Sequence, residues 1–87
     1  MPRFTSRLHT VRDARRLSEA IVREAKAGRL SKVRSLRRDF DRVIEVAEDA
    51  GHAVLMNALA AEHHARQWGN RAELTAAEAV VNRLASG

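Results

Sequence analysis

At 87 residues the chain has room for one domain. A domain this small buries only about two-thirds of the surface that its unfolded chain exposes. A partner or a second copy is therefore expected. The chain contains no cysteine, which excludes disulfides, thiolate metal sites and a cysteine nucleophile, and no apolar run approaches the roughly 18 residues of a membrane span. The net charge of +5 comes from residues 1–42, where 13 Lys and Arg face 5 Asp and Glu, whereas residues 43–87 hold 3 against 6, so the first half favours phosphate or an acidic partner.

Residues 1–9, MPRFTSRLH, lack the apolar core of a signal peptide, and we therefore expect a cytoplasmic protein. If this segment is extended, its side chains alternate between two sides. One side carries Phe4, Ser6 and Leu8, and the other carries Arg3, Thr5 and Arg7. The segment is therefore expected to form a short strand, or a basic arm without fixed structure.

A first helix is predicted over residues 10–27. Thr10 and Asp13 resemble a capping box with Asp in place of Glu, and Gly28 stands where a helix favours a left-handed residue after its last turn. The expected inward face consists of Val11, Ala14, Leu17, Ser18, Ile21, Val22 and Ala25. Arg12, Arg16 and Arg23 fall on the opposite face.

A long central helix is predicted over residues 32–68, with Ser31 as its N-cap. Apolar residues recur at steps of three and four, at positions 33, 36, 40, 43, 47, 50, 54, 58, 61, 65 and 68. Such a helix would run to about 55 Å. Gly51 is the one plausible break, and continuity or a kink is expected there rather than a loop. Arg34, Arg38 and Arg42 face away from the apolar seam.

A third helix is predicted over residues 71–85, because Asn70 and Glu73 resemble a capping box and Leu74, Ala77, Val81 and Leu84 form an apolar stripe. The expected fold class is thus all-α: a single domain, 1–87, of short helix, long central helix and short helix, with a short N-terminal strand or arm. Each short helix folds back against one half of the long helix.

A dimer or partner surface is expected around residues 53–61, AVLMNALAA, which are apolar almost all round the helix. One short helix cannot cover all sides, so Leu55, Met56 and Leu59 are predicted to contact another chain, most simply a second copy. The alternative is that both short helices wrap this segment in a compact monomer. Trp68, just before Gly69, is expected to close a helical hairpin, or else to anchor a partner.

The first 42 residues resemble the opening of ribbon-helix-helix DNA-binding proteins of the Arc and antitoxin type. The resemblance rests on the alternating segment MPRFTSRL, a helix, and then GRLSKVRS. It implies a strand that pairs with its twin in a dimer and places Arg3, Thr5 and Arg7 against bases in the major groove. It also implies that Arg29, Ser31 and Lys32 hold the DNA backbone at a helix N-terminus. Ser6 stands at a place that this family usually fills with an apolar residue.

The leading functional prediction is a small, basic, dimeric regulatory protein that binds nucleic acid through its N-terminal half. Sparse aromatic residues favour duplex DNA over stacking on single-stranded bases. The predicted contact residues are Arg3, Thr5, Arg7, Arg12, Arg16, Arg29, Ser31, Lys32, Arg34 and Arg38. The alternative is a helical adaptor or inhibitor of protein complexes, such as one encoded by a phage or mobile element, with no nucleic-acid role.

No catalytic signature stands out, and we expect neither enzymatic activity nor a cofactor. There is no P-loop, no dinucleotide fingerprint and no Gly-x-Ser-x-Gly. His52 follows Asp49 by three residues, the spacing that some di-iron bundles use, and His63 and His64 directly follow Glu62. Continuing the long helix places His52 and His63 on its polar face. We therefore interpret both histidines as solvated side chains rather than metal ligands.

Overall fold

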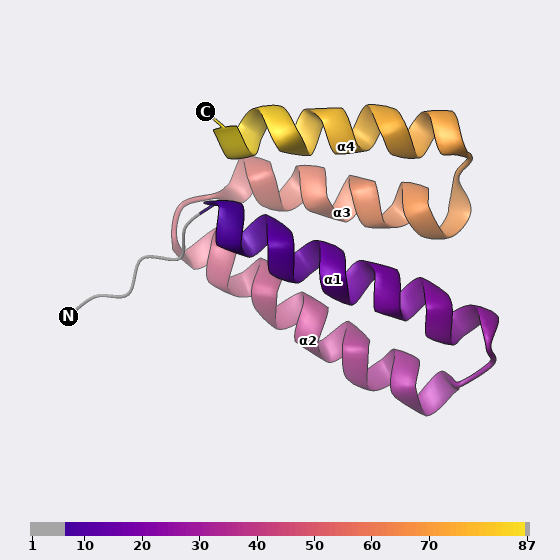
Figure 1. Ribbon diagram of the computed structural model, residues 1–87. Coiled ribbons are helices and arrows are strands. Elements are labelled where there is room, and N and C mark those ends of the chain that lie inside the picture. Colours follow the sequence, from indigo (N-terminus) through magenta and orange to yellow (C-terminus); the bar gives the residue numbers. More distant parts are fainter. Residues whose placement is uncertain (1–6, 87) are drawn as a thin grey trace.

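A computed structural model describes residues 7–86, which form four helices and no strand: α1 Arg7–Lys26, α2 Leu30–Asp49, α3 Ala53–Trp68 and α4 Arg71–Ser86 (Figure 1). The all-α expectation is confirmed for this part of the chain. The three-helix layout is wrong, because the expected long helix is two helices. Residues 7–9, which were expected in the strand or arm, are instead the first residues of α1. The rest of that expected segment, residues 1–6, lies outside the described residues.

Glycines in the left-handed region end both α1 and α2. Gly28 has φ 76° and Gly51 has φ 84°. After α1, the amide of Arg29 donates to the Glu24 carbonyl, and the amide of Gly28 donates to that of Ala25. After α2, His52 and Gly51 repeat the same pair of bonds to Ala47 and Glu48. Both ends are therefore Schellman motifs, in which a glycine satisfies the last carbonyls of its helix and reverses the chain.

The break at Gly51 changes which face of α3 is buried. A seam continued from α2 places Val54, Ala61 and Trp68 inward, but Val54 and Trp68 are 67% and 71% exposed. The buried residues of α3 are Leu55, Leu59, Glu62, His63 and Ala65. The buried positions of α3 thus lie about one residue later in the sequence than the predicted seam. The prediction assumed one continuous helix, and the left-handed Gly51 breaks that continuity.

The predicted helix starts had mixed outcomes. Asn70 caps α4 as expected, because its Oδ1 accepts a hydrogen bond of 2.8 Å from the amide of Glu73. Ser31 is not an N-cap, since α2 begins one residue earlier and Arg29 occupies the cap position without a side-chain bond. Thr10 does not begin α1 either. It lies in the second turn of a helix that starts at Arg7, and its buried hydroxyl has no hydrogen-bond partner.

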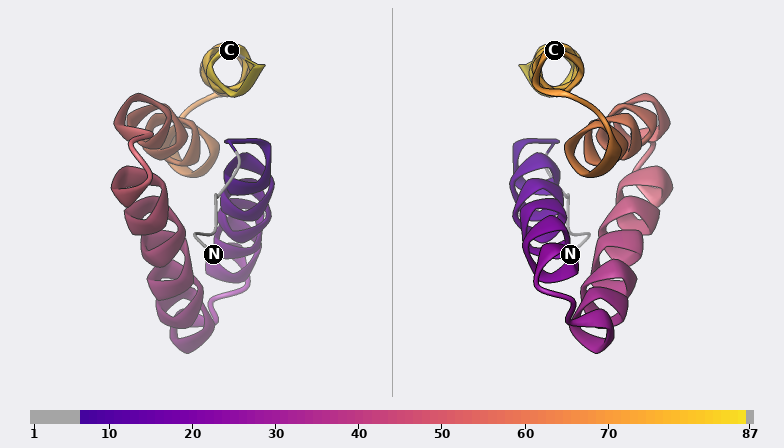
Figure 2. Two further views of the ribbon diagram at one scale, coloured as in Figure 1. Left: turned by 90° about the vertical axis from the view of Figure 1, so that its left-hand side faces the viewer. Right: turned by 90° about the vertical axis from the view of Figure 1, so that its right-hand side faces the viewer.

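α1 and α3 are the central helices of the fold, because each contacts all three of the others. The core formed around them contains Val11, Ala14, Leu17, Ile21, Phe40, Leu55, Leu59 and Val81. α3 and α4 form an antiparallel pair on one side of α1. α2 packs on α1 and α3 and does not touch α4. In Figure 2, α1 and α2 form the arms of a V that meet at their connecting turn, away from α3 and α4.

None of the helices in the described part of the chain combines the length and the hydropathy that crossing a membrane requires.

Candidate nucleic-acid interface

The strongest concentration of positive charge lies at the turn between α1 and α2. Residues 23–38, which we name the basic tip, contain seven Lys and Arg and a single acidic residue, Glu24. The remainder of α2, residues 39–49, contains five Asp and Glu against one Arg. Because the turn projects away from α3 and α4 (Figure 2), the basic tip is open to solvent around its end.

Most cations of the basic tip have no ion pair within the described residues. Arg29 is the exception near the turn, since its Nη1 lies 2.6 Å from Oε2 of Glu24. The hydrogen bond that Arg29 donates lowers the pKa of Glu24 from its ordinary value. Arg37 lies 3.9 Å from Asp41, a loose contact. The exposed, unpaired cations are Arg23, Lys26, Lys32, Arg34 and Arg38.

The N-terminus of α2 adds backbone donors to the basic tip. The amide of Leu30 bonds to Gly28 and that of Val33 bonds to Arg29. Ser31 and Lys32 lie between them in the first turn, where amides face outward and the helix dipole is positive. The first turn of α2 contains no acidic residue that would occupy this position. This arrangement favours a phosphate group.

The structure brings together only half of the predicted contact residues. The basic tip contains Arg29, Ser31, Lys32, Arg34 and Arg38. Arg12 and Arg16 are exposed on α1, further from the turn, and Arg16 lies 3.9 Å from Asp13. Arg7 lies at the opposite end of α1, where it donates a 3.4 Å bond to the Leu84 carbonyl. Arg3 and Thr5 lie outside the described residues.

The prediction omitted Arg23, Lys26 and Arg37, which also belong to the basic tip. Arg23 was assigned to the outer face of its helix but not to the contact set. A count of charge in a window centred on Gly28, rather than over whole halves of the chain, would have found all three.

The predicted dimer surface requires correction. Leu55 and Leu59 are 4% and 2% exposed, and both belong to the core formed with α1, α2 and α4. Met56 is half-buried. These leucines are covered by helices of their own chain, since the break at Gly51 lets α3 lie across α1 instead of extending beyond it. Trp68 is exposed and, contrary to the prediction, does not pack in the core of the helical hairpin. Of the four residues predicted at the interface, Trp68 alone is therefore largely open to a partner.

No family model, curated protein or solved structure matches the chain.

A buried ionic cluster joins α1, α3 and α4 behind the basic tip. Glu62 is 1% exposed, and its two oxygens accept bonds of 2.7–3.1 Å from Arg15. Arg66 donates a further bond of 3.1 Å to Glu62 and lies 3.6 Å from Glu78. Hydrogen bonding to Glu62 raises the pKa of Arg15, although burial acts in the opposite direction. The Glu62 carboxylate joins α1 to α3, and Glu78 joins α4 to both, through Arg66 and through a 3.3 Å bond that its carbonyl accepts from Arg15.

His63 completes this cluster on the side of α2. Ser18 Oγ lies 2.7 Å from His63 Nδ1 and accepts a 2.6 Å bond from Arg66. Ser18 Oγ thus connects the imidazole of His63 to the guanidinium of Arg66. The ring centroids of His63 and Phe40 lie 4.9 Å apart. Burial, followed by the positive charges of Arg37 and Arg66, lowers the pKa of His63.

The interpretation of His63 as solvated is wrong, since it is 5% exposed. Glu62, Ser18 and Arg66 were not identified as a cluster, because Arg15 and Glu62 are 47 residues apart and no local pattern connects them. The arrangement is structural, since Arg15, Glu62, Arg66 and Ser18 pair with one another within the fold. In residues 7–86, no three His, Asp or Glu side chains are placed to hold one metal ion.

The lowered pKa of His63 predicts a loss of stability in mild acid. Unfolded, the imidazole titrates near pH 6.5. Because the folded pKa is lower, the unfolded chain binds the proton more readily, and the contribution of His63 to stability is present above pH 6.5 and is lost as the pH falls through the folded pKa. We expect the free energy of unfolding, measured by urea titration, to fall from pH 7 to pH 5.

His63→Gln should flatten this decline, whereas His64→Gln, at the exposed neighbour, should not. An equal decline in all three proteins would contradict the assignment.

Proposed function

We propose that the protein is a small regulatory protein that binds duplex DNA through the basic tip. The observation that carries the proposal is the segregation of charge along the α1–α2 hairpin. Seven of the sixteen Lys and Arg lie within residues 23–38, accompanied by one acidic residue. A projecting cationic end of this kind is suited to a phosphate backbone, whose charge density makes it the strongest general partner of such a surface.

Duplex DNA is favoured over single strands because the basic tip itself contains no aromatic side chain, and the exposed indole beside it, Trp68, is a single side chain next to Lys26. Residues 23–38 include no Phe, Trp or Tyr. Phe40, the nearest aromatic residue in the sequence, is 4% exposed and packs on His63. Single-stranded binding without sequence preference normally uses aromatic side chains on which bases stack. Arginine, lysine and helix-terminal amides instead contact phosphates.

Arg12 and Arg16 extend the proposed contact surface along α1 towards its N-terminus. Both are exposed, and Arg12 has no ion pair within the described residues. The base contacts of Arg3 and Thr5 that the ribbon-helix-helix resemblance implies belong to this proposal as a separate element, whereas Arg7 lies in α1 instead of a strand and is not part of it. Those base contacts would supply sequence preference, whereas the basic tip supplies affinity.

The test is the fluorescence anisotropy of a labelled DNA duplex titrated with the protein at 50 and 200 mM salt. If the five unpaired cations of the basic tip each neutralise one phosphate, affinity should fall about 500-fold between these conditions. Lys32→Glu with Arg34→Glu should abolish binding or reduce it at least about 100-fold, because two attractive contacts become repulsive.

The matched control is Arg71→Glu with Arg83→Glu, which makes the same change in net charge at exposed positions of α4. We expect this variant to lose far less affinity than the variant of the basic tip. Equal losses in the two variants would show that only net charge matters and would overturn the assignment of the basic tip. Absence of binding at 50 mM salt would overturn the DNA proposal itself.

In that event the function that we propose instead is a helical interaction protein with no nucleic-acid role. One observation supports it: α2 buries only Phe40 and Ala47 completely, whereas α1, which is equally long, buries six residues. A helix with this much half-buried apolar surface is suited to contact with another protein.

A further inference from the structure

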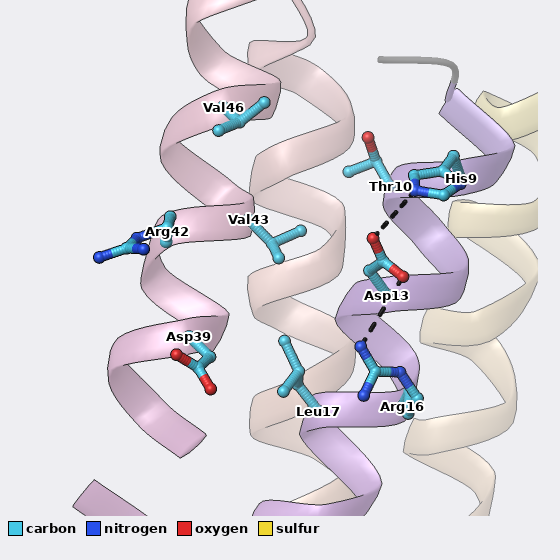
Figure 3. Close-up of a pocket in the computed structure, with 9 residues that line it drawn as sticks. All are labelled: His9, Thr10, Asp13, Arg16, Leu17, Asp39, Arg42, Val43 and Val46. Atoms are coloured by element: carbon cyan, nitrogen blue, oxygen red, sulfur yellow. Dashed lines mark ion pairs between the residues drawn. The ribbon is translucent and has the colours of Figure 1, made fainter. Parts of the chain in front are cut away.

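The open side of the α1–α2 hairpin contains a groove of about 430 Å³, which we name the wedge. Figure 3 views it with α3 behind, and shows Leu17 of α1 and Val43 of α2 directed into the gap between the two helices. Val46, on the same side of α2, is 44% exposed. The other residues of the wedge are His9, Thr10, Asp13, Arg16, Asp39 and Arg42. The wedge therefore has an apolar floor and a rim that carries both signs of charge.

The wedge is the side of α2 that its own chain leaves uncovered. α2 is contacted by α1 and α3 only, and α4 does not reach it. Val43 lines the wedge and packs against the core yet stays half-exposed, and Val46 beside it is 44% exposed. The Cα atoms of the molecule span only 15 Å along the shortest axis, which leaves little depth to enclose these side chains. Another helix laid along the wedge would complete their burial.

The charge pattern of α2 indicates which helix would pack along the wedge. Residues 30–38 carry four cations and no anion, whereas residues 39–49 carry five anions and one cation. This order opposes the macrodipole of the helix, which favours anions at the N-terminus and cations at the C-terminus. Two copies of α2 laid antiparallel would place each basic half beside an acidic half. The pattern is thus unfavourable in one copy and complementary between two, and of these charges Asp39 and Arg42 are the ones that line the wedge.

Two residues of the rim fix the register of such a pair. Asp39 and Arg42 are exposed, line the wedge, and have no ion pair within the described residues. Their spacing of three residues places them on neighbouring turns of one side of α2. Around a two-fold axis midway between them, Asp39 of each copy lies opposite Arg42 of the other. The same register places Ser35 opposite Val46, so that a small side chain meets the exposed valine.

We propose that the protein forms a symmetric dimer in which two copies pack their α2 helices antiparallel along the wedge, with Asp39 of each copy paired to Arg42 of the other. The contact is isologous, as in most homodimers. This surface replaces the one expected around Leu55 and Leu59, and it does not depend on DNA binding.

The test is sedimentation equilibrium of charge-reversal variants. The wild type should be dimeric. Asp39→Arg and Arg42→Asp should each be monomeric, because each places like charges opposite one another twice. The double variant, Asp39→Arg with Arg42→Asp, should be dimeric again. An equimolar mixture of the two single variants should also form dimers, since every pair in the mixed species joins opposite charges.

Arg83→Asp on α4 makes the same charge change as Arg42→Asp far from α2 and should remain dimeric, and far-ultraviolet circular dichroism should show unchanged helix content throughout. A wild type that stays monomeric up to about 1 mM would overturn the proposal, since a specific symmetric interface binds well below that concentration. Dimeric single variants, or a monomeric mixture, would overturn the Asp39–Arg42 register.

Discussion

Glu62→Gln should lower the free energy of unfolding by about 3–5 kcal/mol, the range measured when one partner of a buried ion pair is removed. The amide keeps the size of the carboxylate but leaves Arg15 and Arg66 without its charge, and Arg66 is only 10% exposed at its side chain. In a domain of this size, each kcal/mol corresponds to about 4–8 °C in Tm. Thermal unfolding followed by circular dichroism should therefore show a drop well above 10 °C.

The control for Glu62 is Glu78→Gln, which changes a carboxylate of the same cluster. The Glu78 side chain is 40% exposed and lies 3.6 Å from Arg66, so solvent already screens its charge. We expect a loss of no more than about 1 kcal/mol there. Comparable losses at the two positions would show that Glu62 is not the buried centre of the cluster.

Leu59→Ala should lower the free energy of unfolding by about 2–5 kcal/mol, because the leucine is 2% exposed and its removal leaves a cavity among helices of the same chain. The residue was expected at a dimer surface, where truncation would change the mass in solution and not the stability of the fold. Urea unfolding of the variant therefore distinguishes a core position from an interface position.

Val54→Ala provides the matched control on α3. Val54 is 67% exposed, and its truncation should change stability by less than about 0.5 kcal/mol. A helix continued unbroken from α2 predicts the reverse order, with Val54 in the seam. A larger loss at Val54 than at Leu59 would therefore contradict the observed break and rotation at Gly51.

Local signals in the sequence were sufficient for several elements of the fold. Gly28 was correctly placed after the first helix, since a left-handed C-terminal glycine needs only its own helix to form. Asn70 was correctly placed before the last one for a similar reason, because its cap bond spans three residues. The apolar stripe of residues 33–47 faces the core as its spacing indicated.

What the sequence could not supply depends on competition between distant contacts. Gly51 ends α2 instead of bending it because reversal lets α3 pack on α1, and that gain comes from residues far along the chain. Glu62 illustrates the same limit for charge, since a carboxylate among alanines and histidines is normally solvated, and its burial is compensated by Arg66 together with Arg15, which lies 47 residues away. The positive charge of the first half was evident, but its concentration at one projecting end depends on the hairpin.

The distance from the basic tip to the proposed two-fold axis has a consequence for DNA recognition. With Asp39 opposite Arg42, Leu30 of one copy and Leu30 of the other are separated by 21 residues along antiparallel axes, which at 1.5 Å per residue is about 32 Å. One turn of B-form DNA repeats in about 34 Å. A dimer so built would present its two basic tips to phosphates about one helical turn apart on one face of the duplex, so each dimer is expected to cover about ten base pairs.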